Sequence, residues 1–335
     1  MRGSFYVINN VLTIIVFYLL FSSGEALASA PKNSCIKRLI ATKIVNNDGP
    51  PAYFAKLNGR KVVGFFDPRA MSTFVWANNG YSLDEYNKAS VVGISGISRD
   101  AYYTNIPSLD IGNWHIKEVN SVIISEKIDR PHGNPPAILV VGGEIMNGKS
   151  MMISQGDSAF FLFDYEGSNC PDEGNLLSSK SVYLKLYGDA EHPENKNMIE
   201  TKINGKKVYF SINTSEYSTV MTGESFERVF GKDKLHIIHK NSEMVGENSY
   251  SGYSYTVNLI SMSGLEIKNV PVHVFWGATY NVIGSDILNK FDLIINKDKG
   301  SMWLYPRKNN DDLHRPYHLV WWPTQLRVGE THVQE

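Results

Sequence analysis

An internal repeat restricts the fold of this chain more than any other feature. Residues 55–75 read AKLNGRKVVGFFDPRAMSTFV, and residues 201–221 read TKINGKKVYFSINTSEYSTVM. When the two segments are aligned without a gap, 7 of the 21 positions are identical. Asp67 of the first segment falls opposite Asn213 of the second. A repeat of this kind predicts two structurally related halves within one chain.

Two shorter matches follow the repeat in the same order. Residues 116–119 (IKEV) match residues 267–270 (IKNV). Residues 140–145 (VVGGEI) match residues 282–287 (VIGSDI). Three collinear matches are hard to obtain by chance, so we expect two lobes whose equivalent segments run in the same order.

Both copies of the repeat have the pattern of β-hairpins. Asn58-Gly59 and Asn204-Gly205 lie between β-prone segments, which is the strongest short-range hairpin signal. The sequence has no long helical period. It also lacks the alternation of strands with helices that would indicate a parallel sheet. The pattern predicts strands over Val62–Phe66, Val119–Ile124, Val208–Ile212 and Val270–Phe275, with short helices over Ser225–Phe230 and Ile287–Phe291.

The first residues have the pattern of a signal peptide. Arg2 precedes a continuously apolar run, Val11–Phe21, which is shorter than the roughly 20 residues that span a bilayer. We expect cleavage after Ala28, because cleavage after Ala30 would leave Pro31 at the new N-terminus. An uncleaved anchor is the alternative.

We divide the chain into a signal peptide (1–28), a first lobe (29–170), a linker (171–181), a second lobe (182–307) and a C-terminal tail (308–335), with no membrane span after cleavage.

The chain has two cysteines, Cys35 and Cys170. In an exported protein the compartment is oxidising, so a disulfide between them can persist. On the chain-entropy argument, closing so long a loop stabilises a fold by roughly 4–5 kcal/mol. Two buried free thiols are the alternative, and we favour the bridge.

The charge balance argues against nucleic acid as a partner. Lys and Arg number 33 and Asp and Glu number 34, whereas phosphate binding needs a concentrated basic excess. The nine histidines have no metal-ligand spacing, and no phosphate-binding glycine loop or G-x-S-x-G nucleophile motif is present. We therefore expect no metal and no cofactor. One chain supplies both lobes, which favours a monomer.

The duplicated pattern resembles the aspartic proteases of the pepsin and retropepsin type. In that family each lobe supplies an Asp-Thr/Ser-Gly turn, and a later strand ending in two apolar residues and Gly lies behind it. Gly142 and Gly284 match those structural glycines. The resemblance covers about residues 53–305. It implies an all-β fold with two related lobes of the acid-protease barrel type, a central cleft and short helices only.

The chain departs from the family at the residues that carry the chemistry. That chemistry requires two carboxylates that share one proton. The first turn, Asp67-Pro68-Arg69, keeps the Asp but has Pro in place of the hydroxyl residue and Arg in place of Gly. Pro68 has no N–H and no hydroxyl, and we expect Arg69 to lie in the cleft and to ion-pair with Asp67.

The second turn, Asn213-Thr214-Ser215, keeps the hydroxyl at Thr214. Asn213 at the dyad position cannot ionise, and losing one proton-transfer partner typically costs about 10²–10⁴ in rate. Ser215 replaces the Gly and is expected to line the cleft beside Arg69.

Two glycine-containing segments match the position of the family's flap, the hairpin that covers the cleft. Gly93 and Gly96 lie in the first, within Val91–Ser98, and the second runs from Gly246 to Gly252. A plain surface loop explains either segment nearly as well.

Three functions are compatible with these residues. We favour an exported, secreted or periplasmic protein that lacks peptidase activity and binds a peptide or a protein in the cleft between its lobes. The first alternative is an atypical aspartic endopeptidase that uses Asp67, with Asn213 as a hydrogen-bonding helper or with another carboxylate. The second alternative is a structural component of the cell envelope.

Overall fold

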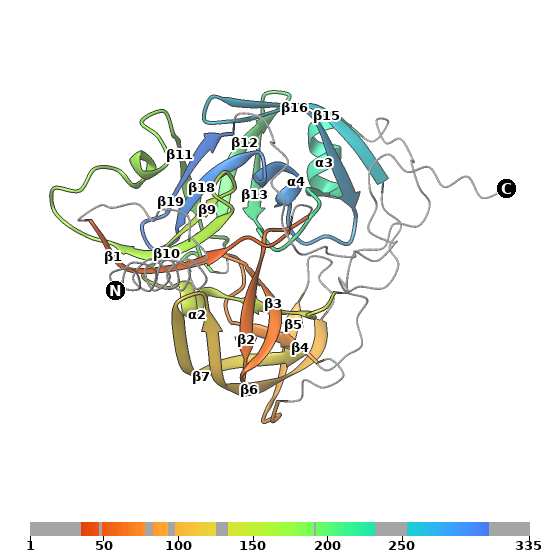
Figure 1. Cartoon of the computed structure of the whole chain (residues 1–335). Coiled ribbons are helices and arrows are strands. Elements are labelled where there is room, and N and C mark those ends of the chain that lie inside the picture. Colours follow the sequence, from red (N-terminus) through yellow and green to blue (C-terminus); the bar gives the residue numbers. More distant parts are fainter. Residues whose placement is uncertain are drawn as a thin grey trace, which may run out of the picture.

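The structure is a computed structural model that forms two groups of strands, one below the other in Figure 1. The strands between residues 52 and 141 lie in the lower group, and all the other strands lie in the upper group. The described residues are 35–46, 49–77, 83–92, 98–124, 133–190, 192–231 and 253–307. The predicted signal peptide and C-terminal tail lie outside them.

The first lobe is a seven-stranded sheet in which β2 pairs with β3 and also with β6. The strand order is β2-β3-β8-β4-β7-β6-β5. Two of the pairs, β3 with β8 and β4 with β7, are parallel. The strands are β2 (Ala52–Leu57), β3 (Arg60–Phe66), β4 (Phe74–Trp76), β5 (Lys88–Val92), β6 (Ser98–Ile111), β7 (Trp114–Ile124) and β8 (Ala137–Val141).

The second lobe repeats the order of six of these strands, and β5 has no counterpart among the described residues. β13 pairs in parallel with β17, and β14 pairs in parallel with β16, as β3 with β8 and β4 with β7 do in the first lobe. The expected two related lobes and mostly β fold are therefore confirmed. The strands are β12 (Met198–Ile203), β13 (Lys206–Ile212), β14 (Val220–Thr222), β15 (Tyr253–Met262), β16 (Leu265–Phe275) and β17 (Val282–Ile283).

Six further strands join the two lobes, and we call them the interlobe sheet. Their order is β1-β10-β9-β18-β19-β11, and β11 continues into the second lobe by pairing with β12. At the centre, β9 pairs antiparallel with β18, so that Ile153 lies opposite Leu293 and Met151 opposite Ile295. The strands are β1 (Ile36–Lys43), β9 (Ser150–Ser154), β10 (Ala159–Tyr165), β11 (Val182–Tyr187), β18 (Phe291–Asn296) and β19 (Ser301–Pro306).

The Asn-Gly turns give the hairpins their register. Asn58 and Gly59 have φ values of 49° and 77°, and Asn204 and Gly205 have 50° and 74°. These left-handed conformations suit Asn and Gly, and they match the twist of the flanking strands. The hairpins β2–β3 and β12–β13 follow directly from the sequence.

Helices are short, as expected, but one of them starts earlier than predicted. Helix α4 covers Ser285–Leu288, and Phe291 begins β18 instead of ending the helix, because it is buried and pairs with Pro306. Helix α3 (Gly223–Phe230) has Thr222 as its N-cap, whose side chain accepts a hydrogen bond from the Ser225 N–H at 3.0 Å. The remaining helices of the described residues are α2 (Gly143–Met146) and the 3-10 turn η1 (Glu173–Leu176).

An aromatic cluster packs the first lobe against the interlobe sheet. The ring centroids of Tyr53 and Phe66 are 4.5 Å apart, and those of Phe66 and Phe160 are 5.1 Å apart. All three side chains are fully buried. Burial of such rings stabilises a core strongly, and here it fixes the end of β3, the strand that leads to Asp67.

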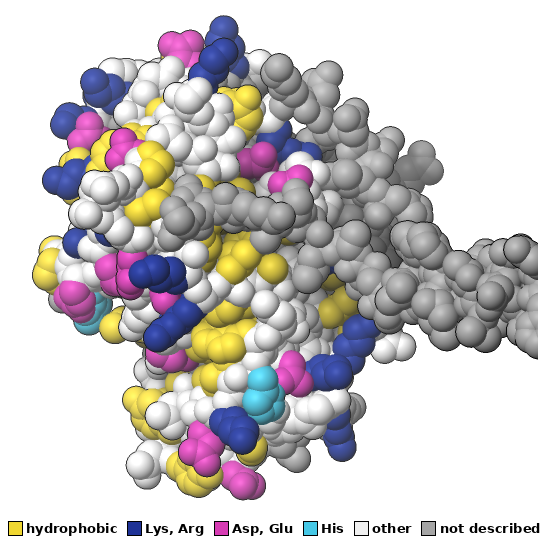
Figure 2. All heavy atoms as spheres, turned by 60° about the vertical axis from the view of Figure 1, so that its left-hand side comes forward, with side chains coloured by type: hydrophobic (Ala, Val, Ile, Leu, Met, Phe, Trp, Pro, Cys, Tyr) yellow, Lys and Arg dark blue, Asp and Glu magenta, His cyan; other side chains and the backbone are white. Residues whose placement is uncertain are grey.

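The surface carries both signs of charge. In Figure 2 the Lys and Arg side chains are interspersed with Asp and Glu on the visible face, and hydrophobic side chains form a broken band between them. In the part of the chain that the structure describes, no helix is long and apolar enough to cross a membrane.

Cys35 and Cys170 form a disulfide, as predicted. The bond connects the start of β1 to the segment after β10, across a sequence separation of 135 residues. It therefore fastens the outermost strand of the interlobe sheet to the chain that leads into η1.

Removal of the disulfide should destabilise the fold without changing it. We expect Cys35→Ser with Cys170→Ser to lower the free energy of unfolding by about 2–5 kcal/mol, because the unfolded chain regains the entropy of a long open loop. Urea unfolding followed by circular dichroism measures the difference. The wild type treated with reductant should behave like the double variant, and an unchanged midpoint in both would contradict the prediction.

Candidate functional site

Asp67 and Asn213 occupy equivalent positions at the ends of β3 and β13. The Asp67 N–H donates to the Val141 carbonyl at 3.0 Å, and the Asn213 N–H donates to the Ile283 carbonyl at 3.1 Å. Both side chains are buried, with 2% and 3% of their surface exposed. The two turns that the repeat predicted to be equivalent are therefore anchored in the same way.

A glycine lies directly behind each turn. A Cβ atom on Gly142 would lie 2.3 Å from the Ser72 carbonyl oxygen, and one on Gly284 would lie 2.5 Å from the Tyr217 carbonyl oxygen. Such contacts leave no room for any side chain. Each glycine N–H donates at 3.2 Å to a threonine hydroxyl, from Gly142 to Thr73 and from Gly284 to Thr219.

The acidic residue two positions after each glycine supports the turn. Glu144 accepts a hydrogen bond from the Thr73 N–H. Asp286 accepts one from the Thr219 N–H at 3.1 Å and one from the Thr219 hydroxyl at 2.7 Å. Burial raises the pKa of Asp286 to about 6, although the Thr219 hydrogen bonds oppose the shift. The matching acids of the repeat thus have matching contacts behind the turns.

The two turns meet each other across the lobes. The Thr214 hydroxyl donates to the Phe66 carbonyl in the first lobe. Pro68, at the position equivalent to Thr214, has no hydroxyl to return this hydrogen bond. The contact between the turns is therefore made from one side only.

A serine hydroxyl lies between the two dyad positions. The Ser215 Oγ is 3.1 Å from the Asp67 Oδ2 and 2.9 Å from the Asn213 Oδ1. The Asn213 Oδ1 also accepts the backbone N–H groups of Ser215 at 2.9 Å and of Glu216 at 3.1 Å. These two donors fix the orientation of the amide, with its oxygen toward the turn.

Arg69 does not pair with Asp67 through its guanidinium group, contrary to our expectation. Only its backbone N–H reaches Asp67, donating to Oδ1 at 2.8 Å. The guanidinium group instead crosses to the second lobe, where Nη1 donates to the Tyr280 hydroxyl and Cζ lies 4.8 Å from the centre of the Tyr280 ring. The oxygens of Asp67 already have contacts with a backbone N–H and with Ser215, and the long Arg side chain extends past them.

Glu216 is a residue near the site that sequence reasoning missed. Burial raises its pKa to about 7, while backbone hydrogen bonds from Ser218 and Tyr217 and the charge of Arg69 lower it. The Tyr217 N–H donates to its Oε1 at 3.1 Å. Its place in the repeat is opposite Ala70, so the duplication itself gave no signal for this carboxylate.

Lys297 adds a second cation close to Asp67. Burial lowers its pKa from the usual value, and the negative charges of Asp67 and Asp298 oppose that shift. Lys297 comes from the turn between β18 and β19, far from both repeats in sequence. The centre therefore has one ionisable dyad residue, Asp67, with cationic side chains on two elements near it.

The expected flaps can be placed only in part. In the first lobe β5 and β6 form an antiparallel hairpin with Lys88 opposite Tyr102 and Val92 opposite Ser98. The tip of this hairpin, with Gly93 and Gly96, lies outside the described residues, and so do Gly246 and Gly252. Among the residues that are described, no three His, Cys, Asp or Glu side chains are grouped so that they could hold a metal ion.

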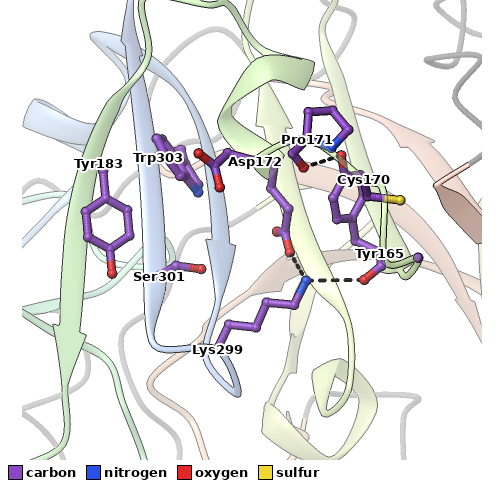
Figure 3. A pocket seen from close by; sticks show the side chains of 10 residues that line it. Tyr165, Cys170, Pro171, Asp172, Tyr183, Lys299, Ser301 and Trp303 are labelled. Carbon is purple, nitrogen blue, oxygen red and sulfur yellow. Dashed lines mark hydrogen bonds and ion pairs between the residues drawn. The ribbon is translucent and has the colours of Figure 1, made fainter.

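A cavity of about 290 Å³ lies elsewhere, on the interlobe sheet beside the disulfide (Figure 3). Tyr183 and Trp303 lie on one side, with Tyr165 and Cys170 across from them, and the Lys299 Nζ donates to the Tyr165 carbonyl at 3.2 Å. Its buried carboxylate, Glu173, accepts hydrogen bonds from Ser150, Asn296 and Lys299, the last at 2.6 Å. These contacts join strands of the sheet to η1, so we read them as structural.

The arrangement of most of the chain is similar to that of a solved aspartic proteinase from Irpex lacteus. The match has a TM-score of 0.50 at 10% sequence identity and covers 80% of this chain and 97% of that chain. The fold is that of the two-lobed aspartic proteases. The fold that the duplicated motif implied is therefore confirmed.

A second structure with the aspartic-protease fold also matches, over a smaller part of the chain. It is a retropepsin-like aspartic protease from Rickettsia conorii, with a TM-score of 0.29 and 20% identity, covering 37% of this chain and 91% of that chain. No protein-family model and no curated protein matches the sequence. The aspartic-protease fold is thus visible in the structure, whereas those sequence comparisons find no relative.

The hydrogen bond between the turns should contribute to stability. We expect Thr214→Val to lower the free energy of unfolding by about 1–3 kcal/mol, because it leaves the buried Phe66 carbonyl without its partner. Thr256→Val, at an exposed position of β15, is the matched control and should have little effect. Equal midpoints for both variants in chemical denaturation would show that the contact between the turns is not stabilising.

The raised pKa of Glu216 should make the fold more stable in acid. Between pH 4.5 and about 7 the native state keeps a proton that the unfolded state releases, so stability falls as pH rises through this range. The contribution is complete below pH 4.5 and is lost by about pH 7, and its upper limit is about 3 kcal/mol. Asp286 acts in the same direction, between pH 3.8 and about 6.

Glu216→Gln should flatten this pH dependence, because the amide does not titrate. The measurement is the melting temperature of wild type and variant at half-unit steps from pH 4 to 8. Glu224→Gln, on an exposed first turn of α3, is the control and should keep the wild-type slope. A variant curve parallel to the wild-type curve would rule out the buried carboxylate as the cause.

Proposed function

We propose that this chain is an exported aspartic-protease-like protein that does not cleave peptide bonds and binds a peptide or protein between its lobes. The observation that carries the proposal is the unequal pair of turns. Both are anchored in the same way, but only Asp67 can exchange a proton, and the amide of Asn213 is held by two backbone N–H groups. A shared-proton mechanism needs a carboxylate on both sides.

Two further contacts argue against the activation of a water molecule at this centre. The Ser215 hydroxyl already lies within hydrogen-bonding distance of both Asp67 and Asn213. The Arg69 side chain crosses from the first turn to Tyr280 in the second lobe. Side chains of the protein therefore occupy the polar positions that a catalytic water would need.

Binding is the function that this scaffold still supports. The structure retains the glycines behind the turns, the acids that hold them and the hydrogen bond from Thr214, all of which position the two lobes. The hairpin β5–β6 of the first lobe is also present.

Export is supported by the disulfide between Cys35 and Cys170, since such bonds persist in oxidising compartments.

A second candidate, an atypical endopeptidase, is favoured by Glu216. Its pKa of about 7 and its position beside Ser215 make it a carboxylate that could replace Asn213 in proton transfer. The two candidates differ in a simple respect. A peptidase of this kind must lose its activity in both Asp67→Ala and Glu216→Gln, whereas a binding protein has no activity to lose.

Peptide-bond cleavage by the purified protein tests the proposal. An unfolded protein substrate is incubated from pH 3 to 7, and the fragments are identified by mass spectrometry. We expect no cleavage above that of a blank, because the site has a single proton-transfer group. Cleavage that disappears in Asp67→Ala would overturn the proposal.

Restoration of the missing groups gives the positive arm of the same test. The variant Pro68→Thr, Arg69→Gly, Asn213→Asp, Ser215→Gly rebuilds both turns and removes the two side chains that occupy the centre. We expect acid-range cleavage at least about 10²-fold above the wild-type level. The matched control carries the same four changes with Asp67→Asn and should be silent. A folded variant that still does not cleave would weaken the assignment of these turns as the dyad positions.

A further inference from the structure

Arg69 carries a charge for which the described residues supply no ion-pair partner. The side chain is largely but not fully buried, at the junction of the two lobes. An arginine in such a place is normally paired, because removing its charge from water without a counter-ion is costly.

Most hydrogen-bond donors of this guanidinium group also have no acceptor within the described part of the chain. Of its five N–H donors, one has a hydrogen bond to a described residue, from Nη1 to the Tyr280 hydroxyl. The Nε atom is buried and has no acceptor among the residues that the structure describes. The ring of Tyr280 lies against the guanidinium group and holds its plane, so the free donors are presented in a fixed direction.

The nearby carboxylates do not supply the missing partner. The Asp67 oxygens contact the Arg69 N–H and the Ser215 hydroxyl. The Glu216 carboxylate accepts hydrogen bonds from the backbone of Tyr217 and Ser218, and its raised pKa leaves it only partly charged at neutral pH. Asn213 is neutral, so the centre has lost the negative charge that a second Asp would place there.

We propose that the ligand of the cleft presents a carboxylate to Arg69. This rests on the proposed function, because it names the chemistry of the peptide or protein that binds there. A carboxylate has the planar, two-oxygen geometry that matches the guanidinium group, and it supplies acceptors for the remaining Nη donors. The carboxylate comes from an acidic side chain or from a peptide C-terminus, and the two sources are distinguished by experiment.

The experiment uses labelled peptides in matched sets with the purified protein. Each set shares one sequence of about ten residues and differs at a central Glu or Gln, and at a free or amidated C-terminus. Several unrelated sequences are tested, and fluorescence anisotropy gives the dissociation constants at pH 7. We expect the Glu form, or the free C-terminal form, to bind about 10–100-fold tighter than its amide counterpart.

Arg69→Gln should remove this preference, so that the acidic and the amide form of each peptide bind within about threefold of each other. Arg60→Gln, an exposed arginine at the start of β3, is the matched control and should keep the preference. Melting temperatures establish that both variants fold. Addition of salt should weaken the binding of the acidic peptides more than that of the amide peptides, because salt screens a partly exposed ion pair.

The outcomes separate this inference from the proposed function. Amide and acidic peptides that bind equally well would overturn the role of Arg69 and leave peptide binding intact. A preference for acid that survives in folded Arg69→Gln would also overturn it. Failure of every peptide to bind would count against the proposed function itself, and this inference would fall with it.

Discussion

The close approach of two chain segments behind each turn is the constraint on which the rest of the structure depends. β8 pairs with β3 and β4, and β17 pairs with β13 and β14. The strands end at Gly142 and Gly284, where a Cβ atom would collide with the carbonyl groups of Ser72 and Tyr217. Only glycine fits there, and the hydroxyls of Thr73 and Thr219 hold the glycine N–H groups. This packing sets the positions of Asp67 and Asn213, whatever chemistry those side chains perform.

Because the scaffold is fixed by these contacts, the residues at the tips of the turns can vary without loss of the fold. Pro68 and Arg69 replace a hydroxyl residue and a glycine, and the first turn still keeps its backbone hydrogen bond to Val141. The charge that Arg69 introduces is directed across to Tyr280 and away from Asp67. The protein thus preserves the framework of an aspartic protease and changes the electrostatics of its centre.

Much of the fold and part of the site could be predicted from the sequence. The Asn-Gly turns and the period of the strands are local signals, and the repeat carried the equivalence of Asp67 and Asn213. The pairing of β9 with β18 could not be predicted, because no local pattern specifies which distant strands meet. Arg69 was placed with Asp67 because they are neighbours in sequence, whereas its actual partner, Tyr280, lies 211 residues away. Glu216 was missed because its pKa depends on burial, which a sequence does not display.

The interlobe sheet has a consequence for the history of such a chain. Its central pair, β9 with β18, joins two equivalent strands, one from each half of the duplication. A single ancestral half would therefore have an unpaired, apolar strand edge of the kind that Met151 and Ile153 present. The same strand of a second copy, related by a twofold axis, would complete that edge. In such a dimer the central strand pair would join two half-length chains, whereas here it lies within one chain whose lobes are connected by the linker.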